Sequence, residues 1–325
     1  MISKDPDCYI KGVLDRSSRI LAKTITMIES SLPAHQELAR NIINQLLPYT
    51  GKAVRLGITG VPGAGKSTFI ESLGIFLLEQ GHSVAVLAVD PSSTRGGGSI
   101  LADKTRMEKL AVAPNAFIRP SPSEGTLGGV ARKTRETMLV CEAAGFDVII
   151  VETVGVGQSE TTVASMVDFF LVLMIAGAGD ELQGIKKGVL EIADALAINK
   201  TDGDNVQKAR MARKEYETAF HFLRPNSLTW SPPVLNCSAI DMTGIAKIWE
   251  TVLDHRKKFS ATGEFNIKRQ KQSVDWMYSL VEEGLKEKFY KNPEIKKELP
   301  ATMEDVRNGS LAPTAAAGRL LSLVN

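Results

Sequence analysis

Cysteine is scarce in this chain of 325 residues, which contains only Cys8, Cys141 and Cys237, far apart and without a CxxC pair. Such a set argues against a disulfide framework and a structural zinc site, and it is typical of a reducing compartment. Long apolar runs are also lacking, and no basic-then-apolar leader opens the chain. We therefore expect a cytoplasmic protein without a membrane span or a secretory signal.

An excess of charge of either sign is missing as well, since the formal net charge is only +2. This balance gives no electrostatic basis for nucleic acid or an anionic membrane as the main partner. Hydrophobic residues make up 43% of the chain, which is enough for a packed core and argues against extended disorder. Composition alone thus leaves an ordinary globular protein.

Periodicity divides the sequence into three parts. Residues 1–50 carry apolar positions at helical spacing, and we expect this N-terminal helical extension to cover one edge of a sheet. Residues 51–258 alternate short β-branched runs with amphipathic helices, the pattern of a mostly parallel sheet covered on both faces. Residues 259–325 lack strand patterns and form a predicted C-terminal helical arm. The predicted strands are VRLGITG, SVAVLAVD, AFIRPS, FDVIIVET, DFFLVLMIA, ADALAINKTD and PVLNCSA.

A phosphate-binding loop is predicted directly after the first of these strands. GVPGAGKST at 60–68 matches GxxxxGK[ST] between a strand and a helix, the context in which this pattern is specific. Its glycines allow the backbone amides to line a phosphate, and Lys66 can reach the β- and γ-phosphates while the Ser67 hydroxyl coordinates Mg²⁺. The predicted phosphate residues are Gly60, Gly63, Ala64, Gly65, Lys66, Ser67 and Thr68.

Base selection is predicted from NKTD at 199–202, which follows a later strand. The Asp202 carboxylate can accept hydrogen bonds from both N1–H and the 2-amino group of guanine, whereas adenine presents no such pair of donors. Lys200 would lie along the purine plane, and Asn199 would brace the neighbouring loops. A backbone amide of the Ser238–Ala239 turn would meet guanine O6. These residues predict a site for GTP and GDP rather than ATP.

Three carboxylates, Asp90, Asp103 and Glu152, are expected near the phosphates as a magnesium site together with Ser67. Asp103 has an alternative structural reading, since it could cap a helix or pair with Lys104 or Arg106. The candidate catalytic residues are Lys66, Asp90, Glu152 and Gln158.

Fast hydrolysis needs a group that orients the attacking water and a cation that neutralises the developing charge. Val156, which follows Gly155, can do neither, and Gln158 is the nearest amide. Arg95 and the cations near Asp103 are candidates for the second role. We expect slow intrinsic hydrolysis that a partner accelerates.

The motifs GVPGAGKST, VDPSS, GGSILADKTRM, VETVGVGQSE, NKTD and CSAIDMTGI together resemble the MeaB/ArgK-type GTPases, a family of dimeric metallochaperone GTPases of the P-loop class. In that family glutamate, as in Glu152, begins the motif where many GTPases have aspartate. The resemblance implies a chaperone that assists and protects adenosylcobalamin-dependent methylmalonyl-CoA mutase and couples nucleotide state to cofactor loading. It further implies a homodimer formed through the C-terminal arm, and a partner-sensing loop at 177–188.

An apolar stripe on the C-terminal helix is too large for a solvated surface and would be buried in the core or against a second subunit. It comprises Trp276, Met277, Tyr278, Leu280, Val281 and Leu285.

Two rival functions stay open from the sequence: a nickel metallochaperone of the same GTPase group and a small-molecule or transport-protein kinase. The first would need clustered soft or imidazole ligands, whereas the four histidines are scattered and interpreted as surface or satisfied structural residues. They are His35, His82, His221 and His255. The second rival, an ATP-dependent kinase, would not need the NKTD motif at 199–202.

Overall fold

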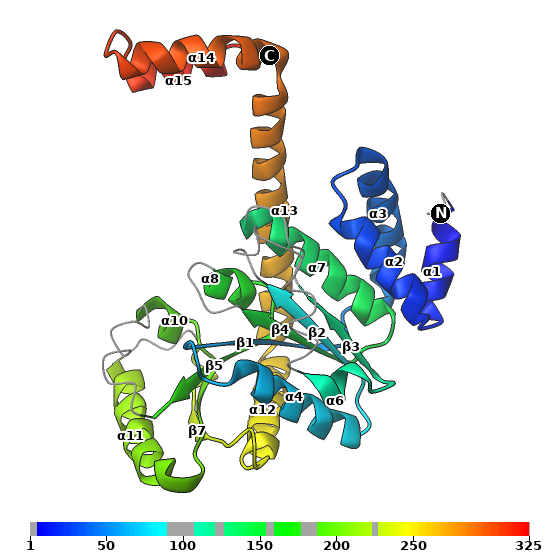
Figure 1. Ribbon diagram of the computed structural model, residues 1–325, viewed down its shortest axis with the longest axis vertical. Coiled ribbons are helices and arrows are strands. Elements are labelled where there is room, and N and C mark those ends of the chain that lie inside the picture. The colour runs from blue at the N-terminus through cyan, green and yellow to red at the C-terminus, as the bar shows by residue number, and fades with distance from the viewer. Residues whose placement is uncertain are drawn as a thin grey trace. The chain divides into compact units, whose positions relative to one another are not determined.

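The computed structural model describes residues 5–89, 107–120, 127–153, 159–176, 187–222 and 227–324. Its centre is a seven-stranded sheet in the order β3-β2-β4-β1-β5-β6-β7, and every adjacent pair of strands runs parallel. Figure 1 shows this sheet between layers of helices. The predicted α/β fold is confirmed.

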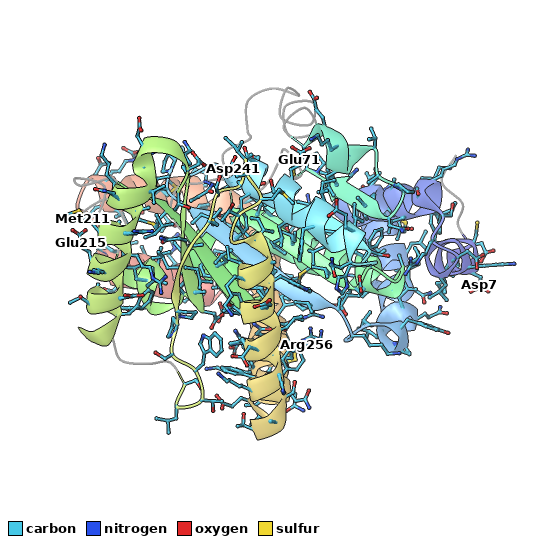
Figure 2. The ribbon with its side chains drawn as sticks, turned by 90° about the horizontal axis from the view of Figure 1, so that it is seen from below. Asp7, Glu71, Met211, Glu215, Asp241 and Arg256 are labelled. Carbon is cyan, nitrogen blue, oxygen red and sulfur yellow. The ribbon has the colours of Figure 1, made fainter. Side chains whose placement is uncertain are left out.

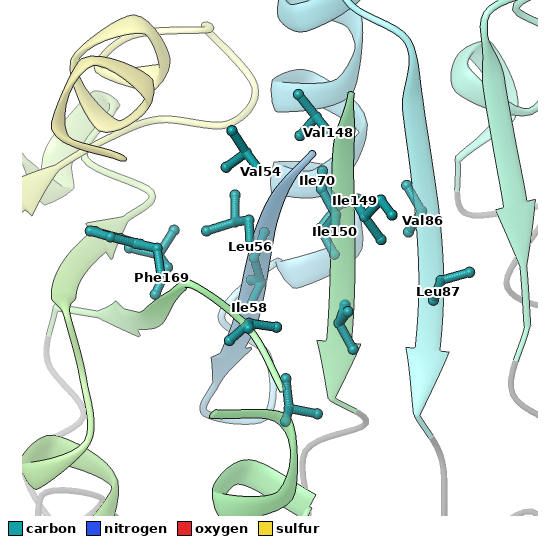
Figure 3. Close-up of a cluster of buried hydrophobic side chains, with 14 of the residues drawn as sticks. Val54, Leu56, Ile58, Ile70, Val86, Leu87, Val148, Ile149, Ile150 and Phe169 are labelled. Carbon is teal, nitrogen blue, oxygen red and sulfur yellow. The ribbon is translucent and has the colours of Figure 1, made fainter. Parts of the chain in front are cut away.

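The strands coincide with the apolar runs of the sequence. They are β1 (Val54–Gly60), β2 (Val84–Val89), β3 (Ala116–Arg119), β4 (Val148–Thr153), β5 (Phe169–Ile175), β6 (Ala195–Asn199) and β7 (Val234–Asn236). Nearly continuous apolar runs are expected where both faces of a strand are covered, and every residue of β2, β4 and β6 is buried. Figure 3 shows the resulting core, in which Leu56, Ile150 and Val86 come from three neighbouring strands.

Helices from different parts of the chain cover the two faces of the sheet (Figure 1). On one face, α4 contacts β1 and β2 and also packs against α6 and α12. On the other face, α7 contacts β2 and β4, and α8 contacts β4 and β1. Glu71 of α4 accepts a hydrogen bond from the backbone amide of Lys109 in α6 at 2.8 Å (Figure 2). The bounds are α4 (Lys66–Glu79), α6 (Glu108–Ala111), α7 (Leu127–Ala143), α8 (Ser159–Ala164), α10 (Lys187–Glu191), α11 (Val206–Phe222) and α12 (Ile245–Thr262), with the 3₁₀ turn η2 (Gly203–Asn205).

The N-terminal helices α1 (Pro6–Leu14), α2 (Ser18–Glu29) and α3 (Pro33–Leu46), followed by the short η1 (Leu47–Tyr49), pack against α7. Their contact with the sheet is made by its edge strand β3, where the Arg119 guanidinium forms an ion pair with both carboxylate oxygens of Glu29. The expected contact at one sheet edge is therefore present, but α7 is the main surface that these helices cover.

An ion-pair network ties the first turns of α13 (Glu264–Lys291) to the amino ends of β1 and β5. Arg269 donates two hydrogen bonds to the Asp168 carboxylate, at 2.8 and 2.7 Å, and further bonds to the backbone oxygens of Gly51 and Ala53. Lys268 Nζ donates to the Asp168 carbonyl at 2.7 Å. The side chains of Asp168 and Arg269 are 5% and 13% exposed, so the pair is almost fully withdrawn from water.

His255 on α12 corrects the expectation that each histidine is exposed or satisfied. It is buried among Phe169, Trp230 and Phe259, and its Nε2 atom has no hydrogen-bond partner. Asp194 Oδ1 lies 3.7 Å from this nitrogen. Burial lowers the pKa of His255 to about 4, although the carboxylate of Asp194 favours the charged form.

The chain separates into two compact units, Met1–Arg269 and Gln270–Asn325. The second contains the rest of α13, with α14 (Pro293–Arg307) and α15 (Pro313–Leu321), which pack together around Ile295 and Ala316. The apolar stripe of α13 is not part of a core: Met277, Tyr278 and Val281 are each at least half exposed. Within the described residues, no helix has the length and apolarity needed to cross a membrane.

Candidate functional site

The phosphate loop leaves β1 at Gly60 and enters α4 at Lys66. Gly63 and Gly65 have φ angles of +77° and +81°, a backbone conformation that residues with a side chain rarely adopt. A Cβ atom at Gly60 would overlap the carbonyl oxygen of Leu173 on β5, and one at Gly65 would lie 3.0 Å from Asn199 Nδ2. The glycines are therefore required by the turn and by its close approach to neighbouring strands.

Lys66 lies over this loop, and its Nζ atom donates a hydrogen bond to the Gly60 carbonyl at 3.0 Å. Ser67 and Thr68 follow in the first turn of α4, where backbone amides and the helix dipole favour an anion. The sequence-predicted phosphate residues, from Gly60 to Thr68, thus form one continuous loop and helix start at the carboxyl edge of the sheet.

Asn199 joins this loop to the predicted base site. It is the last residue of β6 and is 1% exposed. Its Nδ2 donates to the Ala64 carbonyl at 2.8 Å, and its Oδ1 accepts from the Ala239 amide at 3.1 Å. One amide side chain therefore fixes the phosphate loop against the 238–239 turn. We expected a backbone amide of this turn to meet guanine O6; the Ala239 amide would have to share its proton between Asn199 and the base, and the Ser238 amide already donates to the Thr243 carbonyl at 2.9 Å.

Asp202 lies in the same site, and its carboxylate accepts a hydrogen bond from the buried Ser238 hydroxyl. The Ser238 oxygen in turn accepts from the Asp241 amide at 3.2 Å, and Figure 2 labels Asp241. Lys200 has a φ of +58°, an uncommon conformation for a residue with a long side chain. Such strain clusters at functional sites, although Arg16 and Met242 also have positive φ angles in this chain. The structure brings together all five base residues predicted from the sequence.

Glu152 is located at the carboxyl end of β4 and is 6% exposed. It is paired in register with Ile58 of β1. Gly57 faces α8, because a Cβ there would touch Val163, and side chains alternate along a strand. Ile58 and Glu152 therefore face the opposite side of the sheet, where α4 begins. The other expected magnesium ligands, Asp90 and Asp103, lie outside the described residues, as do Gln158 and residues 177–186.

The donor set that is described fits Mg²⁺. Ser67 supplies a hydroxyl oxygen from the first turn of α4, and Glu152 supplies a carboxylate from the strand next to β1 on the same face of the sheet. Both are hard oxygen ligands, which this ion prefers over nitrogen or sulfur.

Three polar contacts at this edge were missed by sequence reasoning. The Ser72 hydroxyl on α4 donates to the Ala239 carbonyl at 2.6 Å. Thr153 donates to Thr59 at 2.7 Å, and both threonines are buried. Burial raises the pKa of Cys237 to about 12, so this thiol stays protonated, 3.6 Å from Asn199 Oδ1. Isolated Ser, Thr and Cys residues carry no motif signal, but a hydroxyl at the end of an otherwise apolar strand, as in ITG and VET, could have marked the threonines.

Comparisons with known proteins agree with this geometry. A sequence model of the family described as "Methylmalonyl Co-A mutase-associated GTPase MeaB" matches residues 21–294. GTPase ArgK of Escherichia coli (strain K12) is 50% identical over 304 residues, covering 94% of this chain and 92% of that protein. The mitochondrial methylmalonic aciduria type A homolog of Mus musculus is 45% identical over 325 residues, covering 97% of this chain and 78% of that protein.

A solved structure described as an LAO/AO transport system kinase has a TM-score of 0.80 and 41% sequence identity, and the match covers 100% of this chain and 99% of that one. Its fold supports the assignment to the P-loop GTPase class. The match to GTPase ArgK over 94% of the chain, together with a glycine-rich phosphate loop braced by Asn199, leads to one assignment. The chain belongs to the family of methylmalonyl-CoA mutase-associated GTPases, MeaB, and its activity is the hydrolysis of GTP.

Proposed function

We propose that this GTPase is a chaperone of adenosylcobalamin-dependent methylmalonyl-CoA mutase, which it assists and protects by coupling its nucleotide state to cofactor loading. The observation that carries the proposal is the match of residues 21–294 to a family described as mutase-associated. The name of the mouse relative, which refers to methylmalonic aciduria, agrees with this proposal. The cytoplasmic location expected from cysteine usage stays a prediction.

In this proposal the chain's own residues bind and orient GTP. Backbone amides of the 60–68 loop and Lys66 hold the phosphates, while Asp202 receives the guanine donors with its orientation set by Ser238. Ser67 and Glu152 would hold Mg²⁺, together with Asp90 and Asp103, and the bound ion would neutralise charge on the β- and γ-phosphates. Lys66 must exchange its Gly60 contact for a phosphate oxygen when GTP enters.

Slow intrinsic turnover is the kinetic consequence. Val156 cannot orient a water, and the nearest side-chain amide in the sequence is that of Gln158. A partner that supplies or positions the missing group would lower the barrier, as a cation or amide does in other GTPases. We propose that the mutase is this partner.

The direct test is GTP hydrolysis by the purified protein, alone and with a stoichiometric adenosylcobalamin-dependent methylmalonyl-CoA mutase. We expect a slow basal rate that rises about tenfold or more, equivalent to about 1.4 kcal/mol of barrier. Lys66→Ala is the control, because it should remove hydrolysis in both conditions. An unchanged rate with mutase, while GTP still binds tightly, would contradict the proposed partner and leave the GTPase assignment intact.

A homodimer is part of the same proposal. Val281 lies four residues after Met277 and three after Tyr278 on α13, and Leu285 lies four after Val281; these four side chains are 50–61% exposed. A stripe of this kind is too apolar to face water in a stable protein. A second copy related by a two-fold axis would cover it, because an isologous contact buries the same stripe of both subunits.

A kinase acting on a small molecule or a transport protein is the alternative, favoured by the description of the solved structure at 41% identity. The two functions differ in nucleotide choice, because Asp202 accepts from guanine donors that adenine lacks. We expect GTP to outcompete ATP by far more than tenfold in a binding competition. A preference for ATP, with transfer of its terminal phosphate to an acceptor other than water, would establish the kinase instead.

A further inference from the structure

The hydrogen bond between Thr153 and Thr59 lies at the point where the two central strands meet the nucleotide site. Thr153 Oγ1 donates to Thr59 Oγ1 at 2.7 Å, and the residues are 0% and 2% exposed. A buried hydroxyl without a partner is costly, so each threonine depends on the other for its placement. The neighbouring strand positions Ile58 and Val151 are apolar and need no such partner.

The positions next to each threonine give this bond its significance. Thr59 precedes Gly60, whose carbonyl accepts the hydrogen bond from Lys66 and begins the phosphate loop. Thr153 follows Glu152, the magnesium-site candidate. The bond thus joins two strand ends. Thr59 is next to Gly60, where the phosphate loop begins, and Thr153 is next to Glu152, the magnesium-site candidate.

The two faces of the sheet separate the bond from the nucleotide. Thr59 shares the face of Gly57, which is directed at Val163 of α8. Glu152 and the start of α4 belong to the other face, so neither threonine hydroxyl can reach a bound nucleotide or metal ion there. Any effect on the reaction must act through backbone position.

We propose that the Thr59–Thr153 hydrogen bond is a positioning device that fixes the distance between the Glu152 carboxylate and the phosphate loop, and so sets the coupling between Mg²⁺ and nucleotide binding. The inference rests on the magnesium site of the proposed function. A shift of an ångström or less between these strand ends is enough to misplace a metal ligand, because protein groups that orient ligands control metal affinity by about 10- to 100-fold. The threonines are positioning residues and take no part in the chemistry.

The experiment compares four variants with the parent: Thr59→Val, Thr153→Val, the double Thr59→Val/Thr153→Val, and Thr153→Ser. Valine keeps the shape of threonine without its hydroxyl, and serine keeps the hydroxyl. For each, GDP affinity is measured with saturating Mg²⁺ and with EDTA, and the ratio of the two affinities reports metal coupling without any hydrolysis. Thermal unfolding of the same samples reports stability.

We expect each single valine variant to lower both the unfolding temperature and the coupling ratio, the ratio falling about tenfold. The double variant leaves no unpaired hydroxyl, so its unfolding temperature should recover towards the parent while its coupling ratio stays low. Thr153→Ser should retain the ratio. Thr24→Val is the matched control, because Thr24 is also fully buried and its hydroxyl donates to the Ile20 carbonyl at 2.9 Å, within a helix remote from the site.

Recovery of both stability and coupling in the double variant would overturn the inference, since the pair would then be a packing feature. Equal loss of GDP affinity with Mg²⁺ and with EDTA in Thr153→Val would also overturn it. If the parent itself shows no Mg²⁺ dependence, the magnesium site of the proposed function fails and the inference fails with it. If the parent depends on Mg²⁺ and every variant keeps that dependence, only the inference fails.

Discussion

At the scale of single residues, Asp202 and Ser238 define the base site more sharply than NKTD alone. Ser238 is 1% exposed, and its hydroxyl donates to one oxygen of the Asp202 carboxylate, which leaves the other carboxylate oxygen for the ligand. The same serine oxygen is held by the amide of Asp241. The carboxylate is therefore oriented before the base arrives, which reduces the ordering cost of binding.

Asp202→Asn should change the preferred base from guanine to xanthine. The new amide presents one donor and one acceptor, which match the 2-oxo group and N1–H of xanthine but oppose the 2-amino group of guanine. We expect GTP affinity to fall by roughly a hundredfold or more and xanthosine triphosphate to become the tighter ligand. Competition against a fluorescent nucleotide measures both. Retained preference for GTP would place guanine recognition elsewhere.

His255 should make stability depend on pH in acid. An unfolded histidine titrates near pH 6.5, whereas burial lowers the folded pKa of His255 to about 4. Between these values the unfolded chain binds a proton that the folded chain does not, so the free energy of unfolding falls as the pH is lowered from 6.5 to 4. The loss amounts to about 3 kcal/mol at the acid end and vanishes above pH 7.

The measurement is denaturant unfolding at a series of pH values, with His255→Phe as the comparison. Phenylalanine suits the aromatic neighbours Phe169, Trp230 and Phe259 and has no nitrogen to leave unpaired. The variant should lose that part of the acid slope which His255 contributes. Identical slopes for the two proteins would show that other groups cause the acid dependence.

Sequence patterns predicted some of these residues and missed others. Asn199, Asp202 and the glycine-rich loop were predicted because their chemistry needs a fixed residue type at a fixed spacing. Ser72 was not, because a hydroxyl that bonds to a partner 167 positions away leaves no trace in local spacing. Thr59 and Thr153 each stand at the end of an otherwise apolar strand, but that position does not name a partner 94 residues away. His255 was misread for the same reason: burial is set by packing of distant segments.

At the scale of elements, the buried ion-pair network between the first turns of α13 and the sheet should contribute to stability. Asp168 receives Arg269 on both oxygens and also accepts the Arg55 amide at 2.9 Å. Arg55 in turn donates to the Glu142 carboxylate on α7 at 2.5 Å. The amino ends of β1 and β5, the end of α7 and the start of α13 thus share one buried network.

Arg269→Ala should lower the free energy of unfolding by about 3–5 kcal/mol, because it leaves the Asp168 carboxylate buried without its counter-charge. Arg213→Ala is the matched control: Arg213 pairs with Glu217 on α11 at 2.7 Å, but both side chains are more than 40% exposed. Loss of this exposed ion pair should lower the free energy of unfolding by about 0.5 kcal/mol or less. Figure 2 shows Met211 and Glu215 on this outer helix. Denaturant unfolding of both variants checks the difference, and equal losses would mean that the buried network does not stabilise the fold.

All seven strands were predictable at this scale, because apolar runs of strand length that alternate with helices are typical of a parallel sheet covered by helices on both faces. The strand order and the Arg269 network were not. Both depend on pairings between distant segments that no alternation or spacing encodes.

At the scale of the whole molecule, the exposed stripe of α13 predicts the oligomeric state. A charge placed within it, as in Val281→Asp, should convert a dimer into a monomer, because covering the stripe would bury that charge without a partner. Ser279→Asp places the same charge on another side of the helix, where the exposed hydroxyl of Ser279 donates to the Asp275 carbonyl at 3.0 Å. Sedimentation of both variants at micromolar concentration checks the expectation. A dimer that survives Val281→Asp would show that the stripe is not its interface.

The sequence predicted this stripe but not which residues face outward. Trp276 and Leu280 were grouped with the others, yet they lie partly buried on a different side of the helix. Helical spacing places them on separate sides only once the phase of the helix is known, and the sequence alone does not give that phase.

The position of α7 changes how the first fifty residues should be regarded. This helix has the sheet on one side and α2 and α3 on the other, so it behaves as an interior helix. Its buried Glu136 has a raised pKa because of that burial, with Arg132 opposing the shift. A chain that began at β1 would expose α7, whose composition suits a helix buried on two sides. The N-terminal helices are therefore a structural part of the nucleotide-binding unit, because they cover the outer side of α7.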